Sequence, residues 1–256
     1  MRAQTVSAAD GWRWLAAGFA IFQRNPPVLS FLVMIYWLIM ALLRALPPII
    51  ALPLSLAMPG LLVGLMQAVR NIERGQAASV QTLVDGLREN TRTLILLGVL
   101  QLVTPLVILG LSTVIDGGTL LQYMMAANRA ERAALEDADF TLSALFVLFM
   151  LAPALMAWWF APVLAAWHRQ PLGKALFFSF VACWLNWRAF LAYGAALLVA
   201  GLVPVMLFGL LASLLPGAAS VIQSLLIVFM VLVMAPAIFA SFYVSYRDIF
   251  AISEIV

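Results

Sequence analysis

Apolar residues fill this chain in long runs, and short polar stretches divide the runs into spans and connections. A membrane-crossing helix needs roughly 20 predominantly apolar residues. Six runs reach or approach that length: Val28–Leu43, Pro48–Val69, Leu94–Ile115, Phe140–Trp167, Phe190–Leu211 and Val221–Val244. The pattern predicts an all-α, polytopic membrane protein with six transmembrane helices in a single integral membrane domain.

Three shorter stretches mix apolar and polar residues at helical spacing: Ala9–Gln23, Ser79–Glu89 and Leu172–Leu185. In the first, apolar side chains recur on one helical face: Trp12, Leu15, Phe19 and Phe22. The spacing predicts amphipathic helices. Such a helix either lies in the lipid interface with its basic residues in the headgroup layer or packs on the end of the helix bundle. The spacing leaves both arrangements open.

Basic residues are shared unevenly between the two sides that six spans define. Of the 14 Lys and Arg residues, only Arg44, Arg129 and Arg132 fall on one side. The positive-inside rule therefore predicts that both termini are cytoplasmic and that the acidic connection from Asp116 to Asp139 is external. Aromatic and basic residues beside the predicted spans are candidates for the cytoplasmic membrane interface: Trp12, Trp14, Arg24, Arg92 and Arg188.

An internal threefold repeat is visible in the spacing of Asn, Pro and Arg. Each amphipathic stretch is followed by an asparagine just before a span: Asn25, Asn90 and Asn186. An asparagine side chain at this position accepts a hydrogen bond from an unpaired helical N–H, so these residues are predicted helix caps. Arg70 and Arg247 each follow a proline of an even-numbered span by 11 residues. We expect three related hairpins, over residues 9–75, 76–170 and 171–256, each preceded by a cytoplasmic amphipathic helix.

Polar chemistry inside the predicted spans is sparse. A proline inside a helix removes a hydrogen bond and kinks the helix, and in lipid the freed carbonyl needs protein or water beside it. The candidate cavity and kink residues are Pro59, Gln101, Thr104, Pro105, Pro153, Gln223 and Pro236. The alternative role of Gln101 and Thr104 is hydrogen bonding between helices, or satisfying the carbonyl freed by Pro105.

The composition narrows the function classes. The chain is 65% hydrophobic and 10% charged, whereas soluble domains have about 45–50% apolar and about 25% charged residues. No Asp, Glu, Lys or Arg lies away from the ends of a predicted span, which argues against coupled transport through a buried carboxylate. The single Cys183 and single His168 cannot form a zinc site of the usual kind. We therefore expect no enzyme, no metal, no cofactor and no nucleic-acid partner.

Two segments carry a family resemblance: GWRWLAAGFAIFQRNPPVL near the N-terminus and MAPAIFASFYVSYRDIF near the C-terminus. They resemble a proteobacterial family of uncharacterised integral membrane proteins. More distantly, they are similar to the membrane domain fused to some glycerophosphodiester phosphodiesterases. The resemblance covers nearly the whole chain and implies a multi-pass protein of the bacterial inner (cytoplasmic) membrane. It implies no catalytic residues, because the soluble phosphodiesterase domain has no counterpart here.

Two functional hypotheses follow from these patterns. The first is a scaffold or accessory subunit that binds membrane lipids or a partner membrane protein, because amphipathic helices are present and candidate catalytic residues are not. The alternative is a permease or exporter for a small apolar or amphipathic solute, with the prolines of the spans around a cavity. The oligomeric state is left open.

Overall fold

A computed structural model describes residues 3–126 and 139–250. Within these residues every regular element is a helix, and no strand occurs. Five helical segments are long and apolar enough to cross a membrane, or six if one bent pair is counted as a single span. The prediction of an all-helical, multi-span protein is thus confirmed, whereas Arg129 and Arg132, used above for orientation, lie outside the described residues.

The odd-numbered spans are continuous helices. They are α2 (Pro26–Ala45), α6 (Thr91–Asp116) and α12 (Trp187–Leu214). Helical hydrogen bonds pair most of their interior backbone groups, as a lipid environment requires, although Pro105 in α6 and Pro204 in α12 each lack an N–H to donate. Short segments follow α6 and α12 at their far ends: α7 (Thr119–Met125) and the 3-10 turn η2 (Pro216–Ala218).

The even-numbered spans are each interrupted. The first consists of α3 (Pro48–Ser55) and α4 (Met58–Glu73), which meet at 45°. The second consists of α9 (Thr141–Trp159) and α10 (Ala161–Trp167), and the third of α13 (Ala219–Phe229), the π-helical η3 (Met230–Met234) and α14 (Ala235–Phe250). A proline is the second residue of each later half: Pro59, Pro162 and Pro236. Pro59 and Pro162 lie in a first helical turn, where the N–H would have no helical partner, whereas Pro236 follows the π-helical turn directly.

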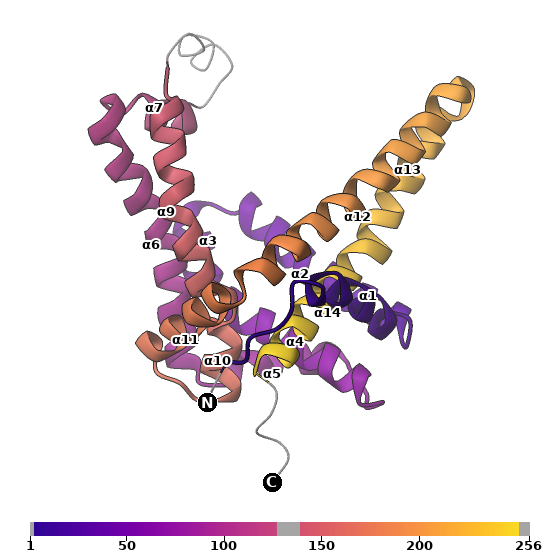
Figure 1. The fold of residues 1–256 in the computed structure, drawn as a ribbon, viewed down its shortest axis with the longest axis horizontal. Coiled ribbons are helices and arrows are strands. Elements are labelled where there is room, and N and C mark those ends of the chain that lie inside the picture. Colours follow the sequence, from indigo (N-terminus) through magenta and orange to yellow (C-terminus); the bar gives the residue numbers. More distant parts are fainter. Residues whose placement is uncertain (1–2, 127–138, 251–256) are drawn as a thin grey trace.

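Three shorter helices lie outside the long spans: α1 (Asp10–Phe22) before the first span, α5 (Val80–Asp85) with the 3-10 turn η1 (Gly86–Arg88), and α11 (Leu172–Leu185). They coincide with the three stretches that the helical spacing predicts. In Figure 1 they lie at one end of the molecule together with α4, α10 and α14, and we call this end the base. The two ends of the described chain also meet there, because the Gln4 N–H donates to the Ile249 carbonyl at 2.9 Å.

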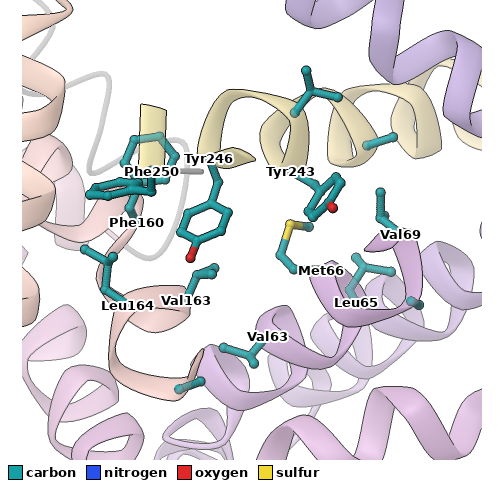
Figure 2. Close-up of a cluster of buried hydrophobic side chains, with 14 of the residues drawn as sticks. Val63, Leu65, Met66, Val69, Phe160, Val163, Leu164, Tyr243, Tyr246 and Phe250 are labelled. Atoms are coloured by element: carbon teal, nitrogen blue, oxygen red, sulfur yellow. The ribbon is translucent and has the colours of Figure 1, made fainter. Parts of the chain in front are cut away.

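The molecule is shaped like a V. One arm holds α6, α7 and α9, the other holds α12 and α13, and the arms diverge from the base toward what we call the open end (Figure 1). The core lies at the base, where α4, α10 and α14 converge (Figure 2). Buried side chains from all three helices meet there, including Leu65, Met66, Phe160, Leu164 and Phe250.

The buried face of α1 differs from the predicted one. The helix buries Gly11, Trp14, Gly18, Ile21 and Phe22, whereas Trp12 and Phe19 remain 49% and 40% exposed. The reason is close backbone packing: a Cβ on Gly18 would lie 2.4 Å from the Ser241 backbone nitrogen. Glycine allows two helix backbones to come close together, but it carries no apolar side chain. The spacing of hydrophobic residues therefore does not identify the helix face on which the glycines lie.

The three asparagines occupy N-cap positions, but the predicted side-chain caps are wrong. None of Asn25, Asn90 and Asn186 makes a side-chain capping hydrogen bond to its own helix. The Asn90 side chain instead donates to the Ala165 carbonyl at 2.8 Å. Asn186 accepts from the Val6 N–H at 2.7 Å and donates to the Gln4 carbonyl at 2.9 Å. The Asn90 amide thus satisfies a carbonyl in the last turn of α10, and the Asn186 amide satisfies backbone groups of the irregular N-terminal segment.

Candidate functional site

A groove of about 430 Å³ lies beside the α3–α4 break. It is bounded by residues of α2, α3, α4, α6, α9 and α10. Most of the lining is apolar, and it includes Met40, Leu43, Leu52, Leu62, Leu97 and Trp158. Four lining residues carry polar groups: Tyr36, Arg44, Ser55 and Gln101. The groove is therefore an apolar surface with a few separate polar points.

The elements around the groove explain how it forms. Gly98 allows α6 to approach the α3–α4 break, because a Cβ there would lie 2.8 Å from the Leu56 carbonyl oxygen. The helix α3 has no buried residue and forms an outer wall. Along α2 the groove extends from Tyr36 to Arg44, which is about 12 Å at 1.5 Å per helical residue.

Arg44 is the only charged residue in this lining. It lies in the last turn of α2, where a cation is favourable beside unpaired helical carbonyls. The side chain is exposed and forms no ion pair with the residues that the structure describes. Within those residues, no other Lys or Arg lies in a connection at the open end. Arg44 thus places one positive charge at the end of an apolar groove that lies beside the C-terminus of α2.

The predicted cavity residues separate into two sets. Pro59 and Gln101 line the groove. Thr104 does not, and its hydroxyl donates to the Leu100 carbonyl of the same helix at 2.7 Å, which is neither a bond between helices nor a bond to the Gln101 carbonyl that Pro105 frees. The remaining candidates also lie elsewhere: Pro105 is exposed inside α6, Pro153 is exposed inside α9, Gln223 is exposed on α13, and Pro236 is buried at the base.

The predicted interfacial residues also have different environments. Trp12 is half-exposed, whereas Trp14 is fully buried and packs edge-on against Phe190 at 5.4 Å between ring centroids. The prediction of an interfacial Trp14 is therefore wrong. Arg24 donates to the Glu73 carbonyl at 2.5 Å. Arg92 is exposed, and so is Arg188, whose guanidinium lies 5.3 Å from the centroid of the Trp187 ring.

A second polar cluster lies at the base, where α4, α10 and α14 end. The Glu73 carboxylate accepts hydrogen bonds from the Tyr243 hydroxyl, at 2.7 Å, and from the Arg247 guanidinium. The Arg70 guanidinium lies 5.0 Å from the centroid of the Trp167 ring. The Arg247 guanidinium also pairs with the Asp248 carboxylate at 2.9 Å, so Glu73, Arg247 and Asp248 already have partners within the cluster. The cluster therefore joins the three helices and is a poor candidate for a ligand site.

The reactive side chains Cys183 and His168 lie in separate environments within the described part of the chain. Burial raises the pKa of the Cys183 thiol to about 12, so the reactive thiolate is scarce at neutral pH. The His168 imidazole shares a 2.6 Å hydrogen bond with the Tyr246 hydroxyl. Among the described residues, no three His, Cys, Asp or Glu side chains come together as a metal site needs. The groove is the feature best suited to bind a molecule.

A protein of Burkholderia thailandensis described as a probable inner membrane protein is 38% identical over 256 residues, covering 97% of this chain and 94% of the relative. The chain belongs to this family of probable inner membrane proteins. No protein-family model matches the chain, and no solved structure matches it. Family membership agrees with the membrane-crossing helices described above and with the predicted location in the bacterial inner membrane.

Several groove residues of this inner membrane protein have no signal in the sequence that assigns them to a cavity. Tyr36 and Trp158 belong to aromatic-rich spans, in which such side chains are common. Arg44 has a partial signal in the sequence, because it is one of few basic residues on the predicted external side of the membrane. Its place at the groove depends on the α3–α4 break, which hydrophobic spacing does not predict.

Proposed function

We propose that this inner membrane protein is a scaffold or accessory subunit that holds a membrane lipid in the groove beside α3. The observation that carries the proposal is the lining of the groove, which is apolar along α2, α3 and α6 and has a charge only at Arg44. An acyl chain fits the apolar part, and a headgroup fits the charged end. The proposal includes no reaction and no cofactor.

The setting of the groove supports this proposal. Its lining residues belong to segments that are long and apolar enough to cross the membrane, so the molecules next to it are lipids. Its volume of about 430 Å³ lies within the roughly 300–1,000 Å³ of ordinary ligand sites. That volume suits part of a lipid and leaves the rest of the molecule in the bilayer.

The proposed orientation has the base in the cytoplasm. The described Lys and Arg residues other than Arg44 belong to the N-terminal segment, the base connections and the end of α14, and such residues concentrate on the cytoplasmic side. The Arg44 end of the groove then lies toward the outer leaflet. Cysteine accessibility at Arg13 and Leu46 in intact cells tests this assignment, since only a cysteine at Leu46 should react with an impermeant reagent.

The proposed threefold repeat is supported by a cyclic packing order. Helix α5 packs on α4, α11 packs on α9 and α10, and α1 packs on α14. Each amphipathic helix thus contacts the even-numbered span that precedes it, and α1 completes the circle with the last span. Superposition of the three hairpins tests the repeat, which stays a prediction, as does the distant similarity to the phosphodiesterase membrane domain.

Photo-crosslinking tests whether lipid occupies the groove. The protein is placed in nanodiscs with a phospholipid that carries a photoreactive acyl chain, and labelled peptides are mapped. We expect labels concentrated on groove residues of α2, α3 and α6.

Leu102→Trp should reduce this label several-fold because Leu102 lines the groove. Leu106→Trp is the matched control, since Leu106 is 68% exposed one turn further along and is absent from the lining. Labels spread evenly over all exposed apolar faces would refute the proposal.

The permease or exporter is the second candidate, and the Pro59 break beside Gln101 in the groove favours it. Transport also requires a path through the base, where aromatic side chains such as Phe160 and Phe250 are packed 5.4 Å apart. Efflux of a fluorescent amphipathic dye from proteoliposomes separates the two candidates. The scaffold proposal expects the same efflux as protein-free vesicles, and faster efflux would favour the exporter.

A further inference from the structure

The charged end of the groove points to one lipid class. We propose that the groove selects an anionic phospholipid, such as phosphatidylglycerol, over a zwitterionic one, and that Arg44 binds the lipid phosphate. This inference rests on the proposed lipid binding in the groove and adds the specificity of that site. It also makes Arg44 the residue that determines which lipid is retained.

The position of Arg44 suits a phosphate. Arg44 lies in the last turn of α2, where a long basic side chain extends toward the headgroup layer while its stem stays among apolar groups. The guanidinium is planar and presents paired donors that match phosphate oxygens. No described residue forms an ion pair with Arg44, so these donors remain available to a ligand.

The rest of the lining explains the expected selectivity. None of the lining residues is Asp or Glu, so the groove offers no carboxylate to a positively charged ammonium. A phosphatidylethanolamine headgroup carries both a phosphate and an ammonium, and its ammonium would lie beside the Arg44 charge without a counter-ion from the groove. A phosphatidylglycerol headgroup has the phosphate and only neutral hydroxyls beyond it. Charge complementarity therefore favours the anionic lipid.

The other polar lining groups do not replace Arg44. Tyr36 lies about 12 Å deeper along α2, at 1.5 Å per residue, where acyl chains rather than headgroups are expected. The Ser55 hydroxyl already donates to the Leu52 carbonyl at 2.7 Å. A single cation at the Arg44 end of the groove is thus the only group of the lining that distinguishes headgroups by charge.

The experiment measures which lipids stay bound. The full chain is purified in mild detergent from nanodiscs made with equal amounts of phosphatidylglycerol and phosphatidylethanolamine, and retained lipid is quantified by native mass spectrometry. We expect wild type to be enriched in phosphatidylglycerol. Arg44→Gln should lower that enrichment about tenfold, as loss of one charge-assisted contact does, while Arg44→Lys should keep part of it. Arg88→Gln is the matched control, because Arg88 is 75% exposed at the base.

The outcomes separate this inference from the proposed function. If wild type and Arg44→Gln retain the same lipid mixture and the groove is still photo-labelled, the selectivity inference is overturned and lipid binding stands. If wild type retains no lipid and the groove is not labelled, both proposals fail. An equal loss of selectivity in Arg88→Gln would also overturn the inference, because a general basic surface would then explain it.

Discussion

The base and the arms of this protein are built from similar apolar sequence, yet they are stabilised differently. At the base, helices approach closely at glycines, and side-chain amides and charges join distant segments. In the arm formed by α12 and α13, only 6% of the apolar segment of α12 is buried inside the protein. The corresponding share is 28% for the last span, Pro216–Phe250, which ends at the base. Hydrophobicity alone therefore places a segment in the membrane, while small residues and polar contacts decide whether it packs on protein or on lipid.

The largest effect should come from adding one methyl group at the base. Gly18→Ala places a Cβ 2.4 Å from the Ser241 nitrogen, so α1 and α14 must separate, at a cost of about 3 kcal/mol of unfolding free energy. Gly201→Ala in α12 is the control, because nothing lies within 4 Å of a Cβ there. It should be neutral or stabilise by about 0.5–1 kcal/mol through helix propensity. The unfolding free energy of both variants is measured in mixed detergent micelles. Changes of the same sign in the two variants would contradict the difference between the base and the arm.

The next effect should come from the amide that joins the N-terminal segment to α12. Asn186 is 2% exposed and bonds to Gln4, Val6 and Ala182. Asn186→Ala leaves these backbone groups without their partner and should lower stability by about 2 kcal/mol. Proteolysis of the first residues should accelerate in parallel. Asn25→Ala is the control, since Asn25 makes no capping bond, and an equal loss there would contradict the role given to Asn186.

A smaller effect is expected at the ion pair of the base. Glu73→Gln keeps an acceptor for the Tyr243 hydroxyl but removes the charge that pairs with Arg247. Because the two side chains are 19% and 38% exposed, solvent screens the pair and the loss should be about 1 kcal/mol. Asp85→Asn removes the more exposed pair with Arg88 and should change stability by less than about 0.5 kcal/mol. In high salt, the loss of unfolding free energy caused by Glu73→Gln should become smaller.

The smallest effect is expected in the arm. Leu198 is 67% exposed on α12, so in the membrane its side chain contacts lipid. Leu198→Val should change the unfolding free energy by less than about 0.5 kcal/mol, as substitutions away from packed sites usually do. A loss comparable to that of Gly18→Ala would mean that the arm packs against a protein surface, such as a partner membrane protein.

The sequence predicts the spans well because membrane insertion depends on the length and hydrophobicity of a segment. It predicts the contacts less well, for identifiable reasons. Gly11 and Gly18 carry the buried face of α1 without adding any hydrophobic signal. Asn90 adopts a left-handed backbone, with φ of 45°, and its amide reaches the end of α10 across 75 positions, a partner that local spacing cannot identify. Pro59 and Gln101 line the groove, while Arg44 joins them only because the second span bends.

The hydrogen bond between Gln4 and Ile249 has a consequence for how the protein is made. Synthesis proceeds from the N-terminus, so α1 is produced before its packing partners α12 and α14 exist. Helix α1 therefore cannot reach its final position until α14 has been made. The Trp12 and Phe19 side chains stay exposed in the finished fold. Until α14 is made, we expect these two side chains to hold α1 at the membrane surface. Truncation of the chain before α14 should accordingly leave α1 on the membrane, accessible to protease.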